Sequence, residues 1–178
     1  MQIMSLSIRK SAILNLLQQN PKLGKTAVMK AVFMLQQVKD IKLGYDFSIY
    51  TYGPYASDVM ADIDDLVEEG FISSTMYPYN NYIGYRLEVT KSGEAEIAVQ
   101  PMDAESQALK DISDFIRGKS AKDLELYSTI IYIANLYTKN AWGGGEKPIV
   151  EKVKEIKPHF STGDIQGAYQ RLKAIKYI

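Results

Sequence analysis

The sequence predicts an α+β fold that is mainly helical, divided into an N-terminal domain over residues 1–100 and an α-helical C-terminal extension over residues 101–178. Two observations carry this prediction. Apolar residues recur at three- and four-residue steps over most of the chain, which is typical of amphipathic helices. Strand-like alternation of apolar and polar residues is confined to short stretches between residues 47 and 89.

Two amphipathic helices are expected first, over residues 7–20 and 25–39, with helix-breaking residues between them. Residues 47–52 alternate apolar and polar side chains and predict a short strand. Gly53-Pro54 is expected to end that strand and to open a third helix, because proline is tolerated in the first turn of a helix.

The third helix is expected to bury one stripe of side chains. Its apolar positions are Tyr55, Val59, Ile63, Leu66 and Val67. Two strands, residues 71–77 and 82–89, follow around the turn-forming residues 78–81, and residues 90–98 return to helix. The order helix, helix, strand, helix, hairpin is that of a winged-helix domain, so residues 1–100 are predicted to be winged-helix-like.

The extension is expected to contain only helices, over residues 103–117, 120–137, 146–157 and 161–177. Ser161 is a natural N-cap for the last of them, with Asp164 in its first turn. The helix over residues 120–137 is apolar on nearly all sides, so it must be buried either within the fold or between two copies of the chain. The sequence leaves open a homodimer through this helix.

Composition narrows the chemistry that this chain can perform. It has 178 residues, no cysteine and a single histidine, His159. Thiol nucleophiles, disulfides and thiolate zinc sites are excluded, and a lone loop histidine supports neither the usual metal sites nor a Ser-His-Asp triad. Gly143-Gly144-Gly145-Glu146-Lys147 lacks the Ser or Thr that follows the lysine of a phosphate loop. No enzymatic activity, cofactor or metal site is expected.

Net charge is zero, but the charges are segregated along the chain. Residues 1–42 hold seven basic residues and one acidic residue, residues 43–146 hold seven basic and seventeen acidic, and residues 147–178 hold seven basic and three acidic. No run of 18 apolar residues occurs, and the N-terminus lacks the basic-then-apolar order of a signal peptide. A cytoplasmic protein without membrane contact is expected.

Acidic residues line the third helix. Asp58, Asp62, Asp65 and Glu69 are spaced by four, three and four residues and therefore share one face. In a winged-helix domain this helix would meet DNA, whose phosphates repel carboxylates. DNA binding is therefore disfavoured and would have to use the basic helices of residues 1–42. A divalent cation held by the four carboxylates is a third, weaker alternative.

Tyrosine is concentrated around the same helix. Eight of the thirteen tyrosines lie between residues 45 and 85: Tyr45, Tyr50, Tyr52, Tyr55, Tyr77, Tyr79, Tyr82 and Tyr85. Strand alternation cannot bury all of them, and tyrosine is enriched at protein interfaces because it gives a large contact area at low entropic cost. Exposed tyrosines beside the acidic face predict a docking surface for a basic protein.

The stretch YTYGPYAS at residues 50–57, preceded by the helix KTAVMKAVFMLQQV, resembles the uncharacterised YwgA-type proteins. Those proteins are similar in turn to the Panacea domain of SocA-like antitoxins. The later phrases DLELYSTIIYIA and KVKEIKPHFSTGDIQGAYQRL resemble the C-terminal half of YwgA-type sequences. The resemblance implies a protein that neutralises toxins or acts as an adaptor through protein contacts, without catalysis. Tyr55 stands where the antitoxin pattern has valine.

Together these observations predict a non-enzymatic winged-helix binding module that docks a protein partner, such as a basic toxin, in the manner of an antitoxin or adaptor. The expected partner-binding residues lie in the turn and on the acidic helix: Tyr52, Gly53, Pro54, Tyr55, Asp58, Asp62, Asp65 and Glu69. A winged-helix transcription regulator that binds duplex DNA is the alternative, followed by an enzyme that uses the carboxylates and a divalent ion.

Overall fold

The computed structural model describes residues 6–79 and 81–178, and these residues form eight helices and four strands. The N-terminal half contains α1 (Ile8–Gln19), α2 (Lys25–Val38), β1 (Ser48–Tyr50), β2 (Gly53–Tyr55), α3 (Ser57–Glu68), β3 (Ile72–Tyr79), β4 (Tyr82–Val89) and α4 (Lys91–Val99). The C-terminal half contains α5 (Ser106–Ile116), α6 (Ala121–Lys139), α7 (Glu146–Ile156) and α8 (Thr162–Ala174). The fold is α+β and mainly helical, as predicted. None of the helices in the described ranges is long and apolar enough to span a bilayer.

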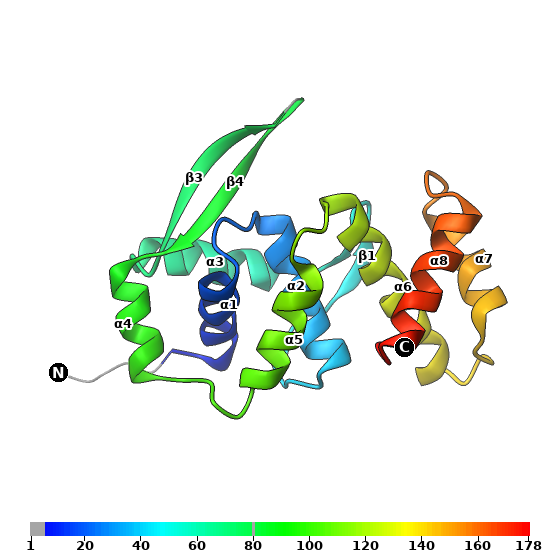
Figure 1. Ribbon diagram of the computed structural model, residues 1–178, viewed down its shortest axis with the longest axis horizontal. Coiled ribbons are helices and arrows are strands. Elements are labelled where there is room, and N and C mark those ends of the chain that lie inside the picture. Colours follow the sequence, from blue (N-terminus) through cyan, green and yellow to red (C-terminus); the bar gives the residue numbers. More distant parts are fainter. Residues whose placement is uncertain (1–5, 80) are drawn as a thin grey trace.

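The strands form two separate antiparallel hairpins. β3 and β4 pair along their whole length, from Ile72 opposite Val89 to Tyr79 opposite Tyr82, which confirms the predicted hairpin. This long hairpin projects away from the helical body (Figure 1). The predicted turn residue Asn80 lies outside the described residues, as do the side chains of Tyr79 and Tyr82.

The second hairpin corrects the sequence prediction. Gly53-Pro54 does not open the third helix: it belongs to β2, which pairs with β1 so that Ile49 lies opposite Pro54 and Tyr50 opposite Gly53. Helix α3 begins only at Ser57. Proline is compatible with an edge strand because no neighbouring strand needs its missing N–H. Gly53 has a φ of +90°, a backbone conformation that residues with a Cβ rarely adopt, so glycine lets the chain turn sharply here.

Helix α6 is the central element of the core. It packs against α2 and β2 on one side and against α7 and α8 on the other (Figure 1). Leu124, Ile130 and Ile131 are at most 1% exposed, so the helix over residues 120–137 is core in this chain. Other elements of the same chain cover the buried side chains of this helix.

The helix ends follow the predicted chemistry. The Ser161 hydroxyl accepts a hydrogen bond from the Asp164 amide and caps α8, as predicted. Ser120 and Asp123 form a capping box at the start of α6, in which hydrogen bonds from the Ser120 hydroxyl and amide lower the pKa of Asp123. Helix α6, which lies next to the hairpin of β1 and β2, therefore has a well-defined start.

Candidate functional site

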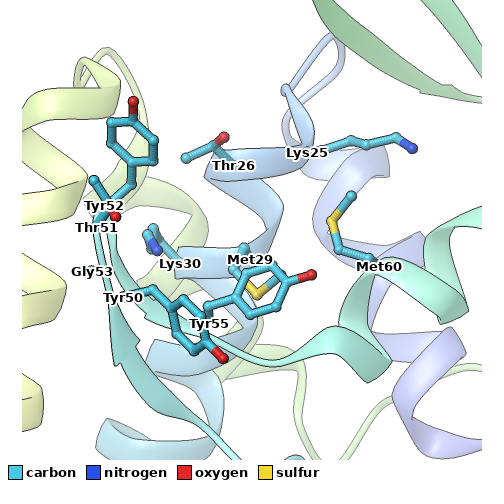
Figure 2. A pocket seen from close by; sticks show the side chains of 10 residues that line it. All are labelled: Lys25, Thr26, Met29, Lys30, Tyr50, Thr51, Tyr52, Gly53, Tyr55 and Met60. Atoms are coloured by element: carbon cyan, nitrogen blue, oxygen red, sulfur yellow. The ribbon is translucent and has the colours of Figure 1, made fainter.

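A pocket of about 480 Å³ opens between α2, the β1–β2 hairpin and the first turn of α3 (Figure 2). We call it the hairpin pocket. Its lining residues come from these three elements: Lys25, Thr26, Met29, Lys30, Tyr50, Thr51, Tyr52, Gly53, Tyr55 and Met60. Three of the predicted partner-binding residues, Tyr52, Gly53 and Tyr55, are among them.

Tyrosine rings surround the mouth of the hairpin pocket. Tyr52 is 71% exposed and Tyr50 is 61% exposed, whereas Tyr55 is partly covered. The rings of Tyr50 and Tyr55 lie against each other with centroids 5.3 Å apart (Figure 2). Such pairs hold aromatic rings in a defined orientation. Exposed aromatic side chains next to a concave apolar pocket are typical of binding surfaces.

Gly53 and Pro54 lie beneath the tyrosines and are buried. A Cβ at position 53 would lie 3.2 Å from the Ser128 hydroxyl oxygen and 3.2 Å from that of Thr129, so only glycine lets the hairpin pack this closely on α6. The Pro54 carbonyl accepts a hydrogen bond of 2.5 Å from Lys30 Nζ. Gly53 and Pro54 therefore position the pocket, and the buried Pro54 offers little surface of its own.

Lys30 is a buried cation at the base of the hairpin. The side chain comes from the middle of α2, and the residue is only 2% exposed. The pKa of Lys30 is lowered to about 8, mainly by burial; the charge of Glu125 partly opposes this change, and the charge of Lys157 adds to it. Sequence reasoning missed this residue because its helical position resembles that of an ordinary surface lysine.

A second buried cation, from the other end of the chain, fixes the hairpin turn. Lys157 Nζ donates hydrogen bonds to the carbonyls of Tyr50, at 2.9 Å, and Thr51. The same Nζ lies 3.0 Å from Glu125 Oε1, an ion pair without hydrogen-bond geometry. His159 Nε2 lies 3.3 Å from that oxygen. The hairpin is thus held from below by Lys30 and Lys157.

One carboxylate of the acidic helix is turned inward, whereas the sequence predicts that all four face outward. Asp62 is 8% exposed, and its Oδ2 accepts hydrogen bonds from Arg9 Nε at 2.7 Å and from the Tyr45 hydroxyl at 2.6 Å. Burial, and then the hydrogen bond to Asp62, raise the pKa of Tyr45. This carboxylate is enclosed by α1 and by the segment that carries Tyr45, so it offers much less surface to a partner than the sequence predicts.

The other carboxylates of the stripe are exposed but paired with basic residues of the same chain. Asp58 lies 3.4 Å from Arg9, whereas Asp65 and Glu69 lie 3.1 and 2.8 Å from Lys10. Within the described residues no group of three or more His, Cys, Asp or Glu side chains is placed to hold a metal ion. The stripe serves first as the surface on which α1 and α3 pack.

This arrangement predicts unequal effects for two carboxylates of α3. Asp62→Ala leaves Arg9 and the Tyr45 hydroxyl without their acceptor, so the free energy of unfolding should fall by about 2 kcal/mol. Asp64→Ala is the matched control, since Asp64 is exposed and makes one ion pair of 2.8 Å with Lys25. Its loss should stay below about 0.5 kcal/mol. Urea unfolding of both variants checks this, and equal losses would contradict a buried role for Asp62.

The protein is a mainly helical α+β protein with a tyrosine-lined pocket, and Lys30 and Lys157 hold the β1–β2 hairpin that forms part of this pocket. The chain is similar to the uncharacterized protein YwgA of Bacillus subtilis (strain 168), with 25% identity over 157 residues, which covers 88% of this chain and 89% of that protein. This similarity supports the resemblance to YwgA-type proteins predicted from the sequence. No protein-family model matches the chain.

Proposed function

We propose that this protein is a non-enzymatic, winged-helix-like binding module that docks a protein partner on the hairpin pocket. The observation that supports the proposal most directly is the exposure of Tyr50 and Tyr52 at the mouth of an apolar cavity. Tyrosines at the centre of an interface contribute most when they are held rigidly and sit beside a pocket that a partner side chain can fill.

The hairpin is organised before any partner arrives. Lys30 and Lys157 fix three carbonyls of its backbone, those of Tyr50, Thr51 and Pro54. Rigid presentation lowers the entropic cost of association, because the loop does not have to be ordered on binding. Burying two ammonium groups beneath one short turn costs free energy of folding because both lose their hydration. We take this cost as support for a binding role of that turn.

The acidic helix has a smaller part in this proposal than the sequence predicted. Asp58, Asp65 and Glu69 are exposed at the edge of the surface, so a partner can still contact them. Because Arg9 and Lys10 already compensate their charge, they give little reason to expect a strongly basic partner. The pocket carries the recognition instead.

The antitoxin- or adaptor-like role rests on the Tyr-Gly-Pro stretch. A relation to the Panacea domain of SocA-like antitoxins, which work through protein contacts, fits a site made of tyrosines over a fixed hairpin. The winged-helix-like character of the N-terminal half fits the order of α1, α2, α3 and the β3–β4 hairpin, with the β1–β2 hairpin inserted before α3.

The DNA-binding alternative needs unpaired positive charge to replace the counterions of phosphates. Within the described part of residues 1–42, six of the seven basic side chains lie in ion pairs with carboxylates, and Lys30 is buried. A regulator using these helices would have to break such pairs. A mobility shift of mixed-sequence duplex DNA at about 50 mM salt would support this alternative.

The proposal is tested by quantitative affinity purification with tagged protein from cells that express it naturally. The double variant Tyr50→Ala/Tyr52→Ala should recover a partner at about one tenth or less of the wild-type amount, because truncating two central aromatic anchors removes well over a kilocalorie of binding energy. The backbone carbonyl of Tyr50 stays available to Lys157 in this variant.

Trp142→Ala is the matched control for that experiment. Trp142 is also 61% exposed, but it lies after α6, contacts Tyr137 edge to face, and is not among the residues that line the hairpin pocket. Partner recovery by this variant should equal that of the wild type. If the tyrosine variant and the tryptophan variant retain every protein equally, the hairpin is not the docking surface and the proposal is wrong.

A further inference from the structure

The hairpin pocket contains a cation whose charge is not compensated at contact distance. Lys30 Nζ donates one hydrogen bond, to the Pro54 carbonyl, although an ammonium group can donate three. Among the residues that the structure describes, no carboxylate lies within ion-pair distance of this nitrogen. Buried charges are normally paired, so an unpaired one that lines a pocket indicates where a ligand anion is expected.

The walls of the pocket in front of Lys30 are apolar. Met29 and Met60 line it from α2 and α3, and the rings of Tyr50 and Tyr55 cover it from the hairpin (Figure 2). Methionine side chains adapt to differently shaped apolar groups. The site therefore suits an occupant with an apolar body and an anionic tip.

From this arrangement we propose that the hairpin pocket binds the C-terminal end of the partner protein, with an apolar last side chain between the methionines and tyrosines and the terminal carboxylate at Lys30. This inference rests on the proposed function and specifies which part of the partner is recognised. A chain end carries its carboxylate one bond from the Cα that bears its last side chain. An internal Asp or Glu would have to bring two flanking peptide segments over the same opening.

The charges around the site favour the carboxylate. Lys25, on the rim, adds positive charge, although its Nζ already lies 2.8 Å from Asp64. Lys30 keeps most of its charge at neutral pH, since burial leaves its pKa at about 8. A hydrogen bond between two charged groups in a site with little water is about twice as strong as one between neutral groups.

The test uses two peptides that differ only at their last group. N-acetyl-Gly-Ser-Gly-Leu with a free carboxylate and the same peptide as a C-terminal amide are titrated into the full-length protein by calorimetry at neutral pH. We expect the free acid to bind with a Kd about tenfold lower than that of the amide, the effect of one charge-assisted hydrogen bond. An amidated N-acetyl-Gly-Glu-Gly-Leu peptide tests whether an internal carboxylate is accepted.

Lys30→Met is the variant that assigns the preference to this residue, because methionine keeps the length and the apolar part of the side chain. In this variant the two leucine peptides should bind with affinities equal to within about twofold. Lys25→Met is the matched control: it removes a rim cation already paired with Asp64, and the preference for the free acid should remain.

A second measurement does not depend on a variant. At a pH of about 8.5, a carboxylate that contacts Lys30 should raise the pKa of this group and cause proton uptake, seen as a binding enthalpy that changes with the ionisation enthalpy of the buffer. The charged groups near Lys30 are Glu125, Lys157 and, at the rim, Lys25; Tyr50, Tyr52 and Tyr55 are titratable residues that also line the pocket. The amide peptide should cause no such uptake.

Equal binding of acid and amide, preference for the internal glutamate, or binding of neither leucine peptide would each overturn the inference. These outcomes differ from failure of the proposed function. If partner capture still depends on Tyr50 and Tyr52 while the free carboxylate gives no advantage, the hairpin pocket docks a protein but not its chain end. If capture is independent of the tyrosines, the proposed function itself is wrong.

Discussion

Lys157→Ala should lower the free energy of unfolding by about 3 to 5 kcal/mol, the effect expected when one member of a buried ion pair is removed. Lys157 is 3% exposed, and its ammonium group serves the carboxylate of Glu125 and the carbonyls of Tyr50 and Thr51 together. Its loss leaves a buried carboxylate near His159 and the more distant Lys30, and it leaves two carbonyls without this donor. Urea unfolding monitored by circular dichroism measures the change.

A double variant separates the charge from the packing. In Lys157→Met/Glu125→Leu both charges are replaced by apolar groups of similar size, so neither member of this ion pair is left without its partner. Buried ion pairs replaced in this way often lose little stability. We expect the double variant to recover at least about 2 kcal/mol relative to Lys157→Ala. If it is as unstable as Lys157→Ala, the contribution of Lys157 comes from the hairpin carbonyls and not from Glu125.

Lys30→Met should have the opposite effect and stabilise the protein. Burial lowers the pKa of Lys30 from 10.5 to about 8, so the folded state disfavours the charged form. At neutral pH this corresponds to an unfavourable contribution of up to about 3 kcal/mol, at 1.36 kcal/mol for each unit of pKa. Methionine removes the charge and fills the same space, but it also leaves the Pro54 carbonyl without its donor. The variant should therefore gain less than this amount in stability, and it should lose the preference for a carboxylate.

The gain should depend on pH in a defined direction. Between about 8 and 10.5 the unfolded chain binds a proton at Lys30 more readily than the folded protein, so wild-type stability from this group rises with pH and is lost as pH falls through about 8. The advantage of Lys30→Met should therefore be constant below about pH 7 and shrink toward pH 10.5.

Other groups affect both proteins alike over this range. Burial raises the pKa of Tyr45, and burial together with the nearby Asp111 raises that of Tyr177 to about 12, so both proteins lose stability when the unfolded chain ionises its tyrosines above pH 10.0. Because this loss is the same in both proteins, it cancels when the stability of the wild type is subtracted from that of the variant. A difference that stays flat from pH 7 to 10.5 would mean that Lys30 is not desolvated.

Local sequence patterns were sufficient for most of the secondary structure. The apolar periodicity located the helices, alternation and turn residues located the β3–β4 hairpin, and Ser161 marked the start of α8. The β1–β2 hairpin was missed because Gly53-Pro54 is compatible both with a helix start and with an edge strand. The close packing of Gly53 on α6 favours the hairpin over a helix start, and the residues that it contacts are more than seventy positions away in the sequence.

The chemistry of the site was harder to predict, because it depends on pairs that are distant in sequence. Arg9 reaches Asp62 across 53 residues, and Lys157 reaches Thr51 across 106. The segregation of charge along the chain was a sign that basic and acidic segments pair with each other. A basic block before residue 43 and an acidic block after it can neutralise each other when α1 packs on α3, and that explanation competes with an acidic docking surface.

The position of Lys157 has a consequence for anyone who wishes to shorten this protein. The hairpin belongs to the first hundred residues, but one of its two supports lies just after α7, and α6 forms the floor on which Gly53 rests. A fragment that stops at residue 100 would keep the tyrosines and lose the scaffold that orients them. The apparent N-terminal module is therefore a poor unit for transplantation, and chimeras should carry the chain through residue 157.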